Sequence, residues 1–292
     1  MKLAGSLVAL VTPFGKDGRL NEAALRELIR YQLKSGSAGL VPCGSTGEAA
    51  TLTHEEYRRV LELTLEESEG LVPVIAGVGT NATWKALESA REAESMGADA
   101  LLVLAPYYNK PTQEGLYRHF CEIAGATRLP VVVYNIPGRT AVNVAPKTLA
   151  RVAKSCENVV AVKEAAGSLD QVSEILSLTP DITVLSGDDS LTLPMMAVGA
   201  RGVISVVANV APKMSADLCR HALDGDFAKA RKTHLKLFPL VKSLFVETNP
   251  IPVKAALELM GLPAGAPRLP LTPLGKEHLP LLRGELKKLG LL

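Results

Sequence analysis

The stretch GADALL, residues 97–102, ends one helical segment and begins an apolar run, and its pattern occurs twice more in the chain. In GSAGLV (36–41) and GARGVI (199–204), a glycine is likewise followed by a small residue, any residue and a second small residue before apolar ones. A glycine at this point fits the left-handed residue that ends many helices. Repeated junctions of this kind predict a parallel sheet whose strands are joined by helices.

Short apolar runs extend this pattern along most of the chain. We expect strands at 6–13, 38–44, 72–78, 98–106, 130–137, 159–165, 182–189 and 201–209. Eight strand–helix units predict an α/β fold, a closed (β/α)8 TIM barrel, and a chain of 292 residues is long enough for it. The rival is an open doubly wound sheet, but no GxGxxG follows the first strand.

Helix signals stand between these runs. Asn21 is a candidate N-cap of a helix that Gly36 ends, and Thr53 with Glu56 matches a capping box for a helix that continues to about Ser68. Further helices are expected near 81–97, 112–127 and 146–156.

The alternation of strands and helices stops after about residue 226, where helical segments are separated by proline-rich turns. We therefore expect a catalytic barrel over residues 1–225 and a C-terminal helical region over residues 226–292, rather than a second catalytic domain.

Composition narrows the function classes. The net charge is only +2 and no basic run is interleaved with aromatics, which disfavours nucleic acid as a partner. No apolar stretch is as long as a membrane span, and the N-terminal apolar run stops at Thr12-Pro13, which favours a first strand over a signal peptide. Four scattered cysteines indicate reduced thiols, and the histidines form no HExxH pair. We expect a cytoplasmic protein without a metal site.

The stretch VVAVKEAAG, residues 159–167, places Lys163 at the end of a strand that reads as buried on both faces. Burial lowers the pKa of an amine, and a neutral lysine attacks a ketone to form an imine. The alternative is a structural lysine paired with Glu164 or with a carboxylate in a loop.

Other polar residues follow other strands of the predicted barrel, and active sites of such barrels lie at these strand ends. The phenols of Tyr134 and Tyr108 and the hydroxyl of Ser45 are candidate proton shuttles. The GSTG turn (44–47) offers N–H groups and hydroxyls to a carboxylate, and Arg139 is suited to bind a second carboxylate. The alternatives are half-buried tyrosines, a turn serine and a surface arginine.

Several motifs in one order make the pattern specific. They are GSTGE, PYYNKP, EGLYRHF, YNIPGRT, VKEAAG, SGDDS, GVISVVANV and NPIPVK. With these, the chain resembles the dihydrodipicolinate synthase family, within the pyruvate-dependent class I aldolase superfamily of N-acetylneuraminate lyase. The resemblance begins at GSLVALVTP (5–13) and covers nearly the whole chain.

The resemblance implies a lyase that condenses pyruvate with L-aspartate 4-semialdehyde, the first committed step of diaminopimelate and lysine biosynthesis. Lys163 matches the imine-forming lysine and Tyr134 the proton-shuttling tyrosine. Ser45 and Tyr108 match the relay partners, the tyrosine being lent across a subunit interface. The family also implies a homotetramer built from two dimers. No cofactor is expected.

The substrate-binding residues are carried over in the same way. Thr46 matches the residue whose turn holds the carboxylate of pyruvate, and Arg139 matches the arginine that receives the carboxylate of the semialdehyde. Gly187 and Ile204 match main-chain contributors around the second substrate.

Two features depart from the family pattern. Ser45 stands where many members have threonine, which keeps the hydroxyl but loses the methyl group that restricts its rotamer. The second departure is at the candidate lysine-effector site. The residues at this site are Ala49, His54, Tyr57, Asn81, Lys85 and Tyr107. Ala49, Tyr57 and Lys85 do not fit the regulated pattern, so we expect weak inhibition by lysine or none.

Three alternatives for the function remain. Another pyruvate-dependent aldolase or lyase would act on sugar acids or hydroxyproline-derived substrates, but Arg139 favours an acidic aldehyde. A catalytically silent barrel would not need Lys163, Tyr134 and Ser45 together. A pyridoxal phosphate site is disfavoured because Asp188 and Asp189 would repel the phosphate.

Overall fold

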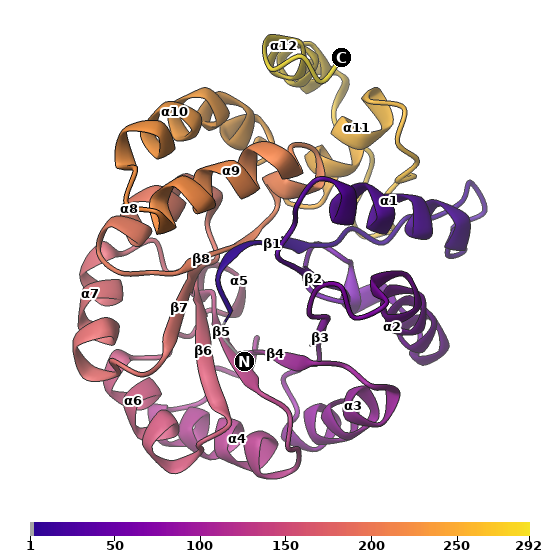
Figure 1. Cartoon of the computed structure of the whole chain (residues 1–292). Coiled ribbons are helices and arrows are strands. Elements are labelled where there is room, and N and C mark those ends of the chain that lie inside the picture. Colours follow the sequence, from indigo (N-terminus) through magenta and orange to yellow (C-terminus); the bar gives the residue numbers. More distant parts are fainter. Residues whose placement is uncertain (1–2) are drawn as a thin grey trace.

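The computed structural model describes residues 3–292 and contains one sheet of eight parallel strands (Figure 1). The strands are β1 Gly5–Ala9, β2 Gly39–Val41, β3 Ile75–Gly77, β4 Ala100–Leu104, β5 Val131–Asn135, β6 Val159–Glu164, β7 Thr183–Ser186 and β8 Gly202–Ser205. Their hydrogen-bonded order is β2-β1-β8-β7-β6-β5-β4-β3, and a parallel bridge between Leu40 and Val74 joins the two end strands. The strands close a barrel, which confirms the predicted fold class.

Helices cover the outside of this barrel (Figure 1). They are α1 Glu22–Lys34, α2 His54–Ser68, α3 Thr83–Met96, α4 Gln113–Gly125, α6 Pro146–Ser155, α7 Leu169–Leu178, α8 Thr192–Ala197 and α9 Pro212–Leu223. The short helix α5 Pro137–Thr140 lies within this ring, near the strands (Figure 1). The 3-10 turns are η1 Ala49–Thr51, η2 Asp189–Leu191 and η3 Val207–Asn209. The sequence pattern predicts no ranges for four of these helices, α5, α7, α8 and α9. The helix α8 has only six residues, too few for helical periodicity to be visible.

The expected helix signals act as predicted. The side chain of Asn21 accepts a hydrogen bond of 3.1 Å from the Ala24 N–H, which caps α1. Thr53 and Glu56 form both hydrogen bonds of a capping box at the start of α2. Gly97 has φ +94° at the end of α3, a conformation that glycine adopts without steric cost.

The strands are shorter than the sequence predicted. The first strand, expected over 6–13, ends at Ala9. Beyond the last residue paired with β8, the side chain of Asn209 bonds the main chain of this segment: it donates to the Ala9 carbonyl at 2.8 Å and accepts from the Val11 N–H at 3.2 Å. The second strand, expected over 38–44, ends at Val41, since Cys43 has a left-handed φ of 55°.

Alternation along the strands separates two buried layers. On β5, Val131 and Val133 pack against the outer helices, whereas Val132 and Tyr134 face the barrel interior. On β6, Val162 belongs to the outer layer and Ala161 to the inner one. Since successive side chains of a strand point to opposite faces, residue 163 faces the interior and residue 164 the helices.

The chain continues past the barrel with α10 Phe227–Ser243, α11 Ile251–Leu259, the turn η4 Lys276–His278 and α12 Leu279–Lys288. The helix α10 packs against α9, α11 contacts η3, and α12 packs against α10 and α11 on the outside of the molecule (Figure 1). A boundary at 225/226 stays a prediction. Among residues 3–292, no helix combines the length and the apolar character that crossing a bilayer requires.

Candidate active site

Lys163 lies near the end of β6 with its side chain directed into the barrel, and it is only 5% exposed. Burial lowers the pKa of its amine to about 7; the carboxylate of Asp189 opposes this change and the guanidinium of Arg139 adds to it. A sizeable fraction of the amine is therefore neutral near pH 7, which a nucleophilic lysine requires.

The alternative in which Lys163 pairs with Glu164 is wrong, because Glu164 points to the opposite face of β6. Its carboxylate accepts from the Asn135 amide at 3.0 Å, from the Gln171 amide at 3.1 Å and from the Ala166 N–H at 2.7 Å. These hydrogen bonds join the ends of β5 and β6 to α7. Glu164 therefore fixes the strand end that carries the lysine.

Tyr134 on β5 is the register partner of Lys163 on β6. The lysine Nζ lies 4.1 Å from the centroid of the tyrosine ring. Burial raises the pKa of the phenol to about 12, an effect that the Arg139 guanidinium and the Ser45 hydroxyl partly oppose. Tyr134 is thus a protonated acid beside the amine, with a hydroxyl next to it that can pass a proton on.

The strand β7 supplies the wall behind the lysine. Gly187 follows β7, and a Cβ on it would come within 2.7 Å of the Ala165 Cβ and 3.2 Å of two carbons of the Lys163 stem. Any side chain at this position would displace Ala165 and press on the stem of Lys163. The family resemblance links Gly187 only to the second substrate, so this contact with the lysine is an addition from the structure.

Asp189 is a buried carboxylate that the sequence analysis considered only as a repulsive charge. It accepts from the Ser205 hydroxyl at 2.6 Å and from the N–H groups of Val206 and Val207 at 2.9 Å each. It therefore joins the end of β7 to the end of β8. Burial raises the pKa of this carboxyl group, and its charged form stabilises the protonated state of Lys163.

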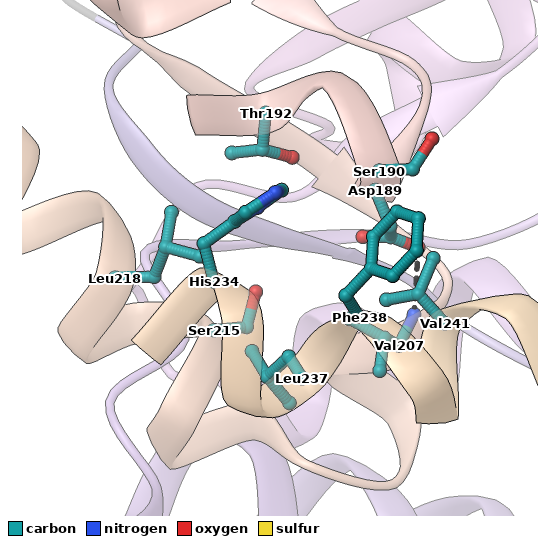
Figure 2. A pocket seen from close by; sticks show the side chains of 10 residues that line it. All are labelled: Asp189, Ser190, Thr192, Val207, Ser215, Leu218, His234, Leu237, Phe238 and Val241. Carbon is teal, nitrogen blue, oxygen red and sulfur yellow. Dashed lines mark hydrogen bonds between the residues drawn. The ribbon is translucent and has the colours of Figure 1, made fainter. Parts of the chain in front are cut away.

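A small cavity lies behind Asp189, between η2, α9 and α10 (Figure 2). It is lined by Asp189, Ser190, Thr192, Val207, Ser215, Leu218, His234, Leu237, Phe238 and Val241. Its volume of about 10 Å³ holds at most one water molecule, so it is not a substrate site.

The turn 44–48 after β2 carries Ser45 and Thr46. Thr46 is buried, and its hydroxyl oxygen accepts from the Asn249 side chain at 2.9 Å. The hydroxyl of Thr12 donates to the Gly47 carbonyl at 2.7 Å. The turn is therefore held in place from both sides before any ligand binds.

Arg139, in the short helix α5, reaches the same region and donates to the main-chain carbonyl of Asn249 at 2.9 Å. Asn249 thus contacts both Thr46 and Arg139, and its side-chain oxygen Oδ1 is buried without a hydrogen-bond partner among residues 3–292. The sequence analysis gave Asn249 no role, although the residue lies in the quoted motif NPIPVK.

The remaining predicted site residues fall in two places. Ile204 on β8 is buried in the barrel interior with Tyr134. Tyr108 is 88% exposed with φ 73°, so it stands outside the buried cluster of its own chain.

The candidate effector residues lie on the connections that follow β2, β3 and β4. Ala49 is in η1, and the imidazole of His54 lies 3.2 Å from the Glu92 carboxylate. The main-chain carbonyl of Asn81 accepts from the Asn109 side chain at 2.8 Å, close in sequence to Tyr107. The amine of Lys85 lies 5.3 Å from the centroid of the neighbouring Trp84 ring.

No group of three or more His, Cys, Asp or Glu side chains within residues 3–292 is arranged to hold a metal ion. The site consists of an amine, a phenol, hydroxyls and a guanidinium, with a buried carboxylate behind the amine. This set can bind a keto acid covalently, move protons at the new bond and hold carboxylates.

Comparison with known proteins gives one consistent picture. Residues 2–289 match the sequence model of the dihydrodipicolinate synthetase family. A 4-hydroxy-tetrahydrodipicolinate synthase of Pelobacter propionicus is 52% identical over 289 residues, 99% of each chain. The crystal structure of a chloride-inhibited dihydrodipicolinate synthase from Acinetobacter baumannii, complexed with pyruvate, superposes over 100% of both chains with a TM-score of 0.98 and 42% identity. A monomeric dihydrodipicolinate synthase variant superposes with a TM-score of 0.97 and 48% identity, over 99% of this chain and 97% of that one.

Proposed function

This chain belongs to the dihydrodipicolinate synthetase family, and from this premise we propose how its residues carry out the reaction. The reaction is the condensation of pyruvate with L-aspartate 4-semialdehyde to 4-hydroxy-tetrahydrodipicolinate, the step that commits carbon to diaminopimelate and lysine. The observation that carries the mechanism is the buried amine of Lys163, with a pKa of about 7, beside the protonated phenol of Tyr134.

The first step forms the imine. The neutral amine of Lys163 attacks the ketone carbon of pyruvate, and the carbonyl oxygen takes a proton. Loss of that oxygen as water leaves a protonated imine, which draws electrons from the adjacent methyl group. Tyr134 supplies and recovers these protons through Ser45. Loss of a methyl proton then gives the enamine nucleophile.

The second step forms the carbon–carbon bond. The enamine carbon attacks the aldehyde carbon of the semialdehyde, and the aldehyde oxygen becomes a hydroxyl by taking a proton. Because the product ring contains the substrate's own nitrogen, that amino group then displaces Lys163 from the imine carbon. The free lysine is thereby restored, and atoms and charge balance over the cycle.

Each carboxylate has a proposed place. The 44–48 turn holds the carboxylate of pyruvate with the N–H groups and hydroxyl around Thr46. Arg139 receives the carboxylate of the semialdehyde, and Gly187 and Ile204 line the second substrate. Support comes from Asn249, which ties Thr46 and Arg139 to one residue and so fixes the two carboxylate sites relative to each other.

We place Tyr108 in the site of a second subunit. Its exposure and its left-handed backbone conformation suit a side chain that extends away from its own barrel. This arrangement requires at least a dimer, and we propose a homotetramer of two dimers in the cytoplasm. The four cysteines are free thiols, which agrees with a reducing compartment.

Arg139→Met is expected to reduce kcat/KM for the semialdehyde by about 100-fold, because the carboxylate of the semialdehyde loses a charge-assisted partner worth about 3 kcal/mol. The KM for pyruvate and the rate with a neutral aldehyde are the internal controls and should change little. Steady-state kinetics with both aldehydes measure this. An equal loss with both aldehydes would contradict the assignment.

The value of kcat/KM for pyruvate is expected to rise with pH through about 7 and to level off above it. The ammonium form of Lys163 dominates at lower pH and cannot attack a ketone, since its lone pair is occupied by a proton. Initial rates at limiting pyruvate, measured in buffers from about pH 5.5 to about pH 8.5, test this. A profile that is flat across neutral pH would refute a titrating nucleophile.

Lysine is expected to inhibit the enzyme weakly or not at all. By the family resemblance, Lys85 stands where regulated members carry an acidic residue, and like charges at short range repel. Lys85→Glu is the matched variant and should be more sensitive to lysine than the parent. Inhibition of the parent by micromolar lysine in the steady-state assay would show that Lys85 does not weaken lysine binding.

The substrate assignment is tested with the purified enzyme, pyruvate and a panel of aldehydes. We expect L-aspartate 4-semialdehyde to be preferred over sugar-derived aldehydes. Preference for a sugar-derived aldehyde would instead identify another pyruvate-dependent aldolase of the same superfamily.

A further inference from the structure

The mechanism leaves one buried lysine unused. Lys254, in α11, is 1% exposed, and its Nζ lies 2.7 Å from a carboxylate oxygen of Glu48, whose side chain is also 1% exposed. The same amine donates to the main-chain carbonyls of Thr12 at 3.0 Å and Ala266 at 3.3 Å. It therefore has a partner for each of its three N–H bonds.

Glu48 is the last residue of the turn that carries Ser45 and Thr46. It has a left-handed φ of 55°, which is unfavourable for a residue with a side chain. Its second carboxylate oxygen accepts from the Arg268 N–H at 2.9 Å. Both oxygens of this side chain are thus bound by residues of the C-terminal region, more than 200 positions along the chain.

Two more contacts hold the same turn. Thr12 accepts from Lys254 through its carbonyl and donates to the Gly47 carbonyl through its hydroxyl at 2.7 Å. Asn249, five residues before Lys254, donates to the hydroxyl of Thr46 at 2.9 Å. Apart from the bond between Lys254 and the Ala266 carbonyl, these contacts end on the turn 44–48 or on Thr12, which supports the turn.

Stability alone does not account for this arrangement. A fully buried ion pair is generally no more stabilising than well-packed apolar residues of similar volume, because both charges lose their hydration. The two charged groups instead favour one relative geometry, in which both carboxylate oxygens of Glu48 and all three N–H bonds of Lys254 have partners. A buried pair of this kind can specify a conformation without increasing the free energy of unfolding.

We propose that the Lys254–Glu48 pair is a positioning device that holds the 44–48 turn in the geometry that binds the carboxylate of pyruvate. The inference rests on the proposed function, since it assigns pyruvate to that turn. It gives the C-terminal helical region a part in the reaction although its lysine touches no reacting atom. Lys254 and Glu48 are positioning residues.

The test compares Lys254→Met with the double variant Lys254→Met/Glu48→Gln. The single variant leaves a buried carboxylate without its cation, so both its Tm and its affinity for pyruvate should fall. The double variant removes both charges, and its glutamine still offers an oxygen to the Arg268 N–H. We expect its Tm to return close to that of the parent, while the KM for pyruvate stays at least tenfold raised and the KM for the semialdehyde is unchanged.

The control is Arg26→Met/Glu67→Gln, which removes an ion pair of 2.7 Å between α1 and α2 on the outside of the barrel. Its KM for pyruvate should equal that of the parent. A Lys254→Met/Glu48→Gln enzyme with the parent's KM for pyruvate would overturn the inference. Parent enzyme that turns over neither substrate would instead contradict the proposed function, so the two failures are distinguishable.

If the double variant does not fold, Thr12→Ala gives a second measurement. It removes the hydroxyl that holds the Gly47 carbonyl and leaves the ion pair and the Lys254 contact to the main chain intact. We expect a raised KM for pyruvate with an unchanged KM for the semialdehyde. If neither KM changes, the result contradicts the inference that this turn is held in place to bind pyruvate.

Discussion

Replacing Lys163 with alanine is expected to lower kcat by at least about 10⁴-fold, because the covalent route through the imine is lost and no other amine lies in its place. The fold should survive, since the lysine is buried at a strand end where the charged form is disfavoured. Lys163→Met, which keeps most of the volume, is the matched variant and should be equally inactive. A coupled steady-state assay measures both variants.

The circular dichroism spectrum and Tm of these variants serve as the control for folding. If an alanine variant that melts like the parent also turns over like the parent, the covalent mechanism is wrong. If the alanine variant is inactive because it is unfolded, the activity of Lys163→Met tests the covalent mechanism in its place.

The second large effect is expected for Tyr134→Phe, with a loss in kcat of about 10²-fold to 10³-fold. The ring that lies 4.1 Å from the Lys163 amine stays, so packing and the contact between amine and ring are retained. What is lost is a protonated phenol with a pKa of about 12, the acid that passes protons to the carbinolamine and the new hydroxyl. Imine formation and condensation should both slow.

Tyr117→Phe is the matched control. Tyr117 lies on α4, and its hydroxyl hydrogen-bonds the Ser155 hydroxyl at 3.0 Å on the outside of the barrel. This variant should keep the rate of the parent. A Tyr134→Phe enzyme within twofold of the parent would show that another group moves the protons.

The sequence predicted the interior of the barrel better than its ends. Apolar runs and glycine junctions locate the strand centres, because burial and chain reversal leave local signals. The strand ends depend on contacts with distant residues: where β1 stops pairing with β8, the side chain of Asn209, 200 residues later, bonds the Ala9 carbonyl and the Val11 N–H instead. No local pattern records such a contact.

The same distinction applies to the site. Lys163 and Tyr134 each end an apolar run, and parallel register then places them side by side. The sequence predicts only a loop charge at Asp189, whereas both oxygens of its carboxylate are bound to the end of β8. The roles of Asn249 and Lys254 depend on how the C-terminal helices pack against the barrel, and helical periodicity carries no information about that partner.

The central claim is that pyruvate forms an imine with Lys163. Enzyme incubated with pyruvate and sodium borohydride, then digested and analysed by mass spectrometry, tests it directly. The account predicts one reduced pyruvate group per chain, on Lys163, and none when pyruvate or the lysine is missing. A label on another residue, or full activity without any trapped adduct, would contradict it.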